Sequence, residues 1–310
     1  MMLARVGMGL GLFLGSVGAG WWLHRRGVLT ESRASRLVRF VVKGLSPLVL
    51  CLSFWRMDLS RAEPWLLPVL GLLVSLSMLL PAWLYAKSAR LSRPETGSFL
   101  ACAYFSNVGY LGAFLAFALF GEGAYALCVL YFLLFSPSFY TIGFSLASHY
   151  GRTKTVSGFG ATLQDQLRLY PFLGMAAGAC LSLARVPRPV ALEWLNHALI
   201  PLDTALYLAA IGSQLTFDSP RPWLRACLAM SAIKFLYAPA VAWGLLSLFG
   251  LHGLPRLIVL IEASTPVAVS PLVLPLLFGV DRKLANALWL FTTGLAIPWL
   301  LLILPALQRL

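Results

Sequence analysis

The sequence has few charged residues. Asp, Glu, Lys and Arg make up 11% of its 310 residues, against about 25% in soluble domains. Hydrophobic residues make up 59%, and the mean hydropathy is +0.82. This composition excludes a soluble globular protein and predicts an all-α polytopic membrane protein. The net charge of +13 does not indicate a nucleic-acid partner, because most charges fall in short loops between apolar runs, as membrane topology requires.

The sequence also lacks the common motifs of enzymes and pumps. It contains no HExxH, GxSxG or P-loop motif and no cysteine pair at metal-ligand spacing. Its five cysteines all fall within apolar runs, where they are expected to pack as small apolar residues. We therefore expect no catalytic residue, no metal and no cofactor, and no nucleotide-driven transport.

Long apolar runs predict ten membrane-spanning helices. Their approximate ranges are 4–23, 36–55, 64–86, 97–120, 122–147, 168–186, 191–216, 222–249, 254–279 and 284–307.

The longest polar connection divides these helices five and five. We expect a first five-helix repeat over 1–148, a cytoplasmic linker over 149–167 and a second repeat over 168–310. An odd number of helices in each half gives the halves opposite orientations, which is an inverted repeat. One set of loops holds about twice as many Lys and Arg residues as the other, so the positive-inside rule places both termini outside the cytoplasm.

The fourth span, within Ser98–Gly121, carries Ser106, Asn107, Gly109 and Gly112 near its centre. Polar groups at this depth are tolerated where they are buried in protein or face a wet cavity, and glycine weakens a helix. The pattern predicts a helix that is broken at its centre.

A related pattern occurs in the ninth span. Ser264–Gly279 begins with serine and a small polar residue and ends in Leu-Phe-Gly at the spacing found in Ser106–Gly121. Here the helix-breaking residues are Pro266 and Pro271. Interrupted segments at matching positions of two halves indicate the substrate site of a secondary transporter.

These stretches resemble the auxin efflux carrier family of permeases, which is related to the bile acid/sodium symporters. The resemblance covers nearly the whole chain. It rests on four stretches in order: GLFLGSVGAGWWLHRRGVLTESRASRLVRFVVKGLSPLVL, SNVGYLGAFLAFALFG, IPLDTALYLAAIGSQL and EASTPVAVSPLVL.

The resemblance implies that broken helices four and nine cross. It also implies a scaffold of helices 1, 2, 6 and 7 and a transport part of helices 3–5 and 8–10 that moves as an elevator. The implied substrate is a small organic anion, as with auxin, malonate or malate in the family. By position, Asn107 and Pro266 match the family's two crossover residues, and a homodimer through the scaffold is implied.

Several residues at the two breaks are candidates for substrate binding. Asn107 offers both a donor and an acceptor, and the end of a half-helix beside it favours an anion; the alternative is an amide that ties two helices together. Hydroxyls at the breaks either line the site or bond back within their helices. The full set of candidates is Asn107, Ser106, Gly109, Thr265, Pro266 and Ser270.

Asp203, Glu262 and Lys234 are charged residues inside predicted spans. Such charges cost at least about 2.5–3.5 kcal/mol at a helix centre on insertion scales. Two carboxyl groups and one lysine cannot all neutralise one another, so one carboxyl could bind H⁺ or Na⁺ for coupling. The alternative is a static pair of Lys234 with Asp203 or with Glu262.

The sequence thus favours a secondary transporter of a small organic anion. We expect it in the inner (plasma) membrane of a bacterial cell, in contact with membrane lipid. A ligand- or lipid-binding sensor of the same fold would use the same site. An intramembrane enzyme acting through Asp203 or Glu262 is the third alternative.

Overall fold

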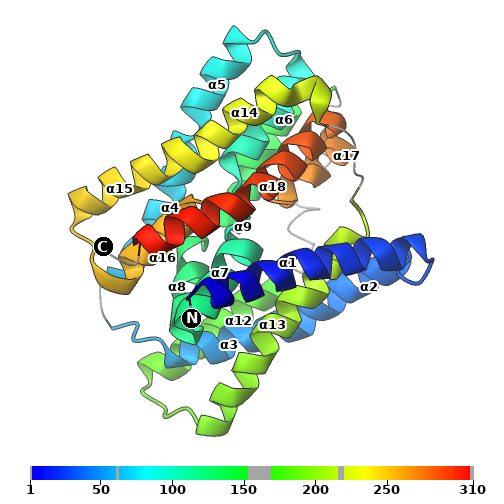
Figure 1. Cartoon of the computed structure of the whole chain (residues 1–310). Coiled ribbons are helices and arrows are strands. Elements are labelled where there is room, and N and C mark those ends of the chain that lie inside the picture. The colour runs from blue at the N-terminus through cyan, green and yellow to red at the C-terminus, as the bar shows by residue number, and fades with distance from the viewer. Residues whose placement is uncertain (1, 61–62, 153–168, 216–219, 308–310) are drawn as a thin grey trace. The chain divides into compact units, whose positions relative to one another are not determined.

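The computed structural model describes residues 2–60, 63–152, 169–215 and 220–307. Most of the predicted linker over 149–167 lies outside these ranges. The described chain is helical, with one isolated β-bridge and no strand. Figure 1 shows its helices in chain order. The chain divides into two compact units. Unit 1 comprises Met1–Pro64, Ala113–Leu127 and Ser157–Leu215, and unit 2 comprises Trp65–Gly112, Cys128–Val156 and Thr216–Leu310.

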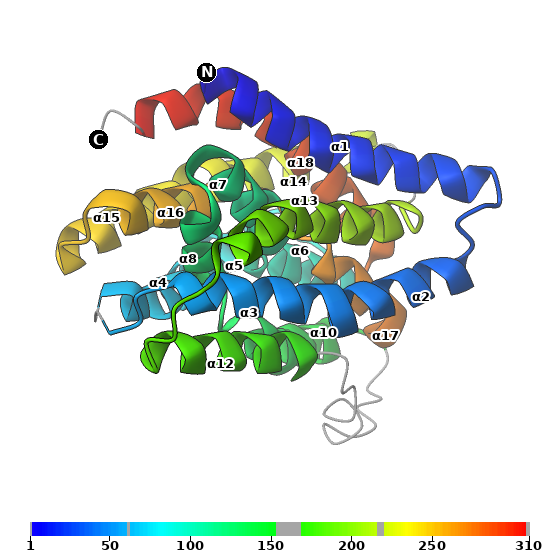
Figure 2. The same ribbon diagram turned by 90° about the horizontal axis from the view of Figure 1, so that it is seen from below.

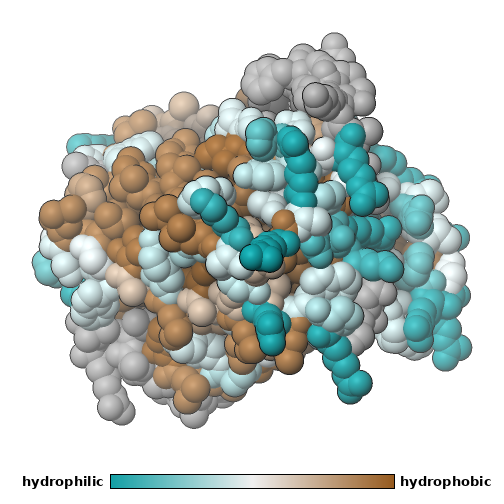
Figure 3. All heavy atoms as spheres, turned by 90° about the horizontal axis from the view of Figure 1, so that it is seen from above, coloured by the Kyte–Doolittle hydropathy of each residue, from teal (hydrophilic) through white to brown (hydrophobic). Residues whose placement is uncertain are grey.

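Five helices of the described residues are long and apolar enough to cross a membrane. They cover Val6–Arg25, Glu31–Arg56, Glu63–Ser88, Arg221–Phe249 and Arg282–Ile303, and each overlaps one of the predicted spans. Large apolar side chains are exposed on them, including Leu236, Leu248 and Leu302. Apolar side chains also cover wide areas of the face in Figure 3. These surfaces fit a lipid environment.

Unit 1 is built from pairs of closely packed helices. α1 (Met2–Arg25) lies along α13 (Val190–Gly212), and α12 (Leu169–Leu183) lies along α3 (Ser46–Arg56) (Figure 2). Before α3, α2 (Glu31–Phe40) continues through a π-helical turn, η1 (Val41–Leu45). The unit also contains α7 (Ala113–Phe120) and most of α8 (Glu122–Tyr131).

Glycine permits these close approaches. A Cβ on Gly174 would lie 2.1 Å from the Pro47 carbonyl oxygen, and one on Gly178 would lie 2.2 Å from that of Cys51. Gly20 and Gly212 approach the facing backbone equally closely between α1 and α13. Glycine therefore allows these helix backbones to pack directly against each other.

Unit 2 contains the two stretches that were expected to break. η2 (Glu63–Trp65) precedes α4 (Leu66–Ser77), and α5 (Leu79–Ser88) packs on α6 (Arg93–Tyr104). The chain then leaves the helix before η3 (Val108–Gly112). Later, α16 (Gly253–Ala263) ends before η8 (Ser270–Val273) and α17 (Leu274–Phe278).

A capping box of Ser92 and Glu95 begins α6, and the hydrogen bond from Ser92 lowers the pKa of Glu95.

The remaining helices of unit 2 flank these segments. η6 (Arg221–Trp223), α14 (Leu224–Ala232), η7 (Ile233–Tyr237) and α15 (Ala238–Phe249) follow one another, and α14 packs on α18 (Arg282–Leu307). The predicted span 122–147 is not one continuous helix in the described structure. After α8 the chain turns at 132–134 and continues as α9 (Phe135–Ser138), η4 (Phe139–Gly143) and α10 (Phe144–Tyr150). Pro137 explains the turn, because its ring clashes with the carbonyl of Leu133.

Candidate functional site

The two interrupted stretches lie against each other in unit 2. We call residues 105–107 and 264–269 the paired interruptions. Ser106 and Val267 form an antiparallel bridge. The Asn107 N–H donates to the Pro266 carbonyl at 2.8 Å, and the Ala268 N–H donates to the Phe105 carbonyl at 3.0 Å. The backbone groups that leave the helices are therefore satisfied by each other, which a membrane-buried break requires.

Two side chains complete this backbone pairing. The Val267 N–H donates to Thr292 Oγ1 of α18 at 3.2 Å. Lys234, on η7, is fully buried, and its Nζ donates to the carbonyls of Ala103 and Phe105 at 2.7 and 3.2 Å. A third bond goes to Ser106 Oγ at 2.8 Å. Three acceptors match the three N–H groups of an ammonium, which therefore lies at the negative end of α6.

Asn107 differs from its neighbours because part of its side chain is unused. The residue is 3% exposed, and its Nδ2 has no hydrogen-bond partner among the described residues. Ser270 Oγ is likewise buried and without a partner in the described part of the chain. Because buried polar groups are normally paired, these two atoms are available to a ligand.

The other candidates at the breaks have local roles in this structure. Thr265 Oγ1 donates to the Glu262 carbonyl at 2.7 Å, and Ser264 Oγ donates to the Leu260 carbonyl at 2.7 Å. These bonds terminate α16, so the back-bonding alternative holds for both hydroxyls. Pro266 contributes its carbonyl to the pairing, and Gly109 lies near the ring of Phe132.

A small cavity adjoins Ser106 in unit 2. Hydroxyl-bearing residues that line it are Ser75, Tyr104, Ser106, Tyr131 and Ser138. Its volume is about 20 Å³, which is room for about one water molecule. The Tyr104 hydroxyl is buried without a partner among the described residues. The cavity must widen before it can admit an organic anion.

The three charged residues within spans are not paired with one another in the described contacts. The contacts of Lys234 are those to the end of α6. Asp203, in unit 1, is 4% exposed and accepts a hydrogen bond from Ser46 Oγ at 2.7 Å. Glu262, in unit 2, is fully buried, and neither of its carboxyl oxygens has a nitrogen or oxygen partner among the described residues.

A second charged cluster, which the sequence did not reveal, lies in unit 1. Glu122 is 2% exposed. Its two oxygens accept hydrogen bonds from Arg188 at 2.5 and 2.9 Å, and one also accepts from Asn196 Nδ2 at 2.5 Å. The bond to Glu122 raises the pKa of Arg188. Glu122 also lies in the first turn of α8, where a carboxylate suits a helix N-terminus.

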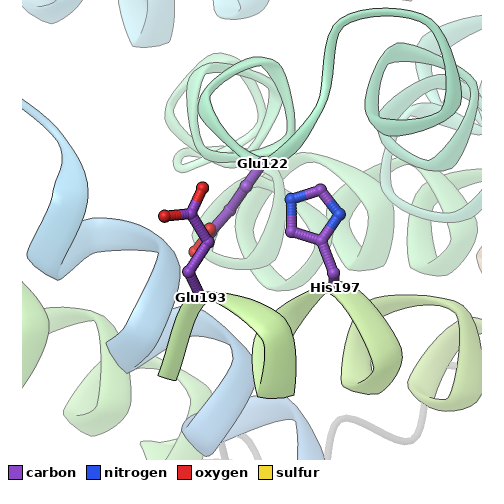
Figure 4. Close-up of side chains that lie close together, drawn as sticks. All are labelled: Glu122, Glu193 and His197. Carbon is purple, nitrogen blue, oxygen red and sulfur yellow. The ribbon is translucent and has the colours of Figure 1, made fainter. Parts of the chain in front are cut away.

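Glu122, Glu193 and His197 also lie near enough to suggest a metal site (Figure 4). Glu193, however, pairs with Arg56, and Arg56 also lies 3.9 Å from Glu122. Two arginines thus neutralise the two carboxylates, which leaves no excess negative charge for a cation. The cluster is a structural network that joins α3, α8 and α13. Its sequence signal is that Arg56 and Arg188 fall in loops predicted on the same side of the membrane.

Comparison with known proteins identifies the family. The family model described as membrane transport protein matches residues 12–166 and 160–304. The chain belongs to this family, that of the auxin efflux carrier-like permeases. It is a transporter and not an enzyme, and an integral membrane protein.

Two relatives are archaeal. An uncharacterized transporter of Methanothermobacter thermautotrophicus is 25% identical over 283 residues, which cover 90% of each chain. An uncharacterized transporter of Methanocaldococcus jannaschii is 25% identical over 285 residues, covering 88% of this chain and 90% of the relative.

Proposed function

We propose that this transporter is a secondary carrier of a small organic anion, bound at the paired interruptions. The observation that carries the proposal is the unpartnered Nδ2 of buried Asn107, at a point where the surrounding backbone is already paired. An unused N–H donor at such a point calls for an acceptor. A carboxylate is the strong acceptor among small metabolites.

The charge near this site supports an anion. The ammonium of Lys234 bonds to Ser106, the residue next to Asn107 in the chain. No carboxylate pairs with Lys234 in the described contacts, so its positive charge is not cancelled locally. The substrate class is therefore a monocarboxylate or dicarboxylate, like the auxin, malonate and malate of the family.

The proposal includes an elevator-type movement. Asn107, Lys234 and Glu262 all belong to unit 2. The helix pairs α1–α13 and α3–α12 of unit 1 lie in the expected scaffold helices 1, 2, 6 and 7. Unit 1 also contains α7 and most of α8, which lie in the expected transport helices 4 and 5. Ten spans in two inverted repeats, both termini outside the cytoplasm of a bacterial cell and a homodimer through unit 1 are further parts of the proposal.

A ligand screen tests the binding step. The purified protein would be heated in detergent with a panel of monocarboxylates and dicarboxylates. We expect at least one to raise the unfolding temperature of the wild type, since a ligand stabilises the state that it binds. Asn107→Ala should remove that shift, and Asn286→Ala, at a buried amide of α18, should keep it. A shift that survives in Asn107→Ala would place the ligand elsewhere.

A further inference from the structure

Glu262 carries a buried carboxyl group in unit 2 that the substrate site does not use. It lies in the last turn of α16 with no exposed surface. Neither carboxyl oxygen has a nitrogen or oxygen hydrogen-bond partner among the described residues, and the Cys128 thiol lies close to the carboxyl. An ionised carboxylate is strongly disfavoured in such surroundings, whereas the neutral acid is tolerated far better. The structure therefore shows the carboxyl in an environment that suits its protonated form.

The chain provides a specific space for this carboxyl. A Cβ on Gly112 would lie 2.1 Å from Glu262 Oε2 and 2.6 Å from its Cδ. The carboxyl thus occupies the position that a side chain at residue 112 would need. Any other residue there would displace it, so glycine at 112 is a requirement of this contact.

This contact is linked to the substrate site through one short segment. Gly112 ends η3, and its N–H donates to the Asn107 carbonyl at 3.1 Å. A change in charge or position of the Glu262 carboxyl therefore acts on the backbone that holds Asn107. Such a link is what coupling between an ion site and a substrate site requires.

The groups around Glu262 do not supply a counter-charge. From α8, Cys128 and Tyr131 lie near it. The packed helices α4 and α15 contain no titratable residue, η3 carries Tyr110, and the charges of α18, Arg282 and Lys283, are in its first turn.

The remaining basic residues near α16 have other contacts. Arg256, on α16 itself, lies over the ring of Trp243. Lys234 binds the end of α6. A hard metal cation takes several oxygen ligands, and in the described structure the Glu262 carboxyl meets a glycine and a thiol instead.

We propose that Glu262 is a proton-binding residue and that transport is coupled to H⁺ rather than to Na⁺. The coupling of transport to H⁺ rests on the proposed function, whereas proton binding by Glu262 does not. The carboxyl holds a proton in the state described here and releases it to water when the site opens. Tyr131 lies near Glu262 and lines the cavity beside Ser106, which gives the proton a polar route.

Infrared spectroscopy tests proton binding without a substrate. The carbonyl stretch of a protonated carboxyl would be recorded while the pH of the purified protein is raised. We expect a band in the wild type that is lost in Glu262→Gln and kept in Asp203→Asn, which changes the buried carboxyl of unit 1. A spectrum that Glu262→Gln leaves unchanged would overturn the proposal.

Transport tests the coupling. An inward pH gradient should drive accumulation of substrate in wild-type proteoliposomes. Glu262→Gln should lose at least tenfold of that accumulation, and Gly112→Ala should weaken it, whereas Glu63→Gln, at an exposed site, should not. Accumulation driven by Na⁺ alone would overturn the proposal. If the wild type carried no anion, the proposed function would fail, and the infrared result would still decide proton binding.

Discussion

Lys234 shows how one residue stabilises a broken helix. Its Nζ meets the carbonyls of Ala103 and Phe105, groups that would lack an intrahelical donor where α6 ends. The sequence identified Lys234 as an unusual charge within a span, and one interpretation was a static pair with a carboxylate. The described contacts give it backbone carbonyls instead. Sequence spacing could not show this, because Lys234 lies 131 residues from Ala103 and 129 residues from Phe105 in the chain.

Replacing Lys234 by methionine should destabilise unit 2. The change keeps the apolar stem but leaves the buried Ala103 carbonyl without its described donor, while the Phe105 carbonyl keeps the Ala268 N–H. An unsatisfied buried acceptor of this kind costs about 2 kcal/mol. The measurement is the thermal unfolding temperature in detergent. Lys283→Met, at an exposed site on α18, should change stability by no more than about 0.5 kcal/mol. Equal stability of Lys234→Met and the wild type would contradict this account.

At the scale of elements, the breaks were predictable and their surroundings were not. Asn107 with its neighbouring glycines, and Pro266 with Pro271, indicated where the fourth and ninth spans are interrupted.

The turn after α8 was missed because the apolar run continues through Pro137. Proline also lacks an N–H, so its effect depends on what satisfies the freed carbonyl. At Pro81, Tyr237 donates to the Ser77 carbonyl at 3.3 Å, and the span continues with a bend.

Small residues were also only partly informative at this scale. Glycines of the first and sixth spans differ in their surroundings. Gly178 lies against α3, whereas Gly11 has no heavy atom near its Cβ position in the described structure. The position of a glycine can be read from the sequence, but whether it faces another helix cannot.

Gly178→Leu should therefore destabilise unit 1 far more than Gly11→Leu. A leucine at 178 must push α12 away from the Cys51 backbone, and overpacking of this kind costs about 1–3 kcal/mol or more. The same substitution at 11 points into open space. The comparison would be made by thermal unfolding of both variants. Equal losses of stability would show that the α12–α3 contact is not as close as described.

At the scale of the whole molecule, each compact unit draws on both halves of the chain. Composition predicted a membrane protein, and the resemblance predicted the family that the comparisons confirm. The division into units follows from packing of distant segments, which no local pattern contains. The proposed elevator requires the transport part, helices 3–5 and 8–10, to move relative to the scaffold of helices 1, 2, 6 and 7.

Distance measurements between spin labels test that movement. One label would be placed on exposed Cys180 of unit 1 and one on Leu248→Cys of unit 2, a position that is 77% exposed. Substrate and pH should change the distribution of this distance. A control pair within unit 1, Cys180 and Val190→Cys, should not change. Shifts in both pairs, or in neither, would contradict rigid movement of the transport part against the scaffold.

The most direct test of the central claim is uptake of labelled carboxylates by proteoliposomes that contain the wild type or Asn107→Ala. The account predicts saturable uptake of at least one organic anion by the wild type. It predicts a loss of at least tenfold in Asn107→Ala, with unchanged insertion and folding. Equal uptake by the two proteins would contradict the site. Binding without uptake would contradict transport of the anion and favour a ligand sensor of the same fold.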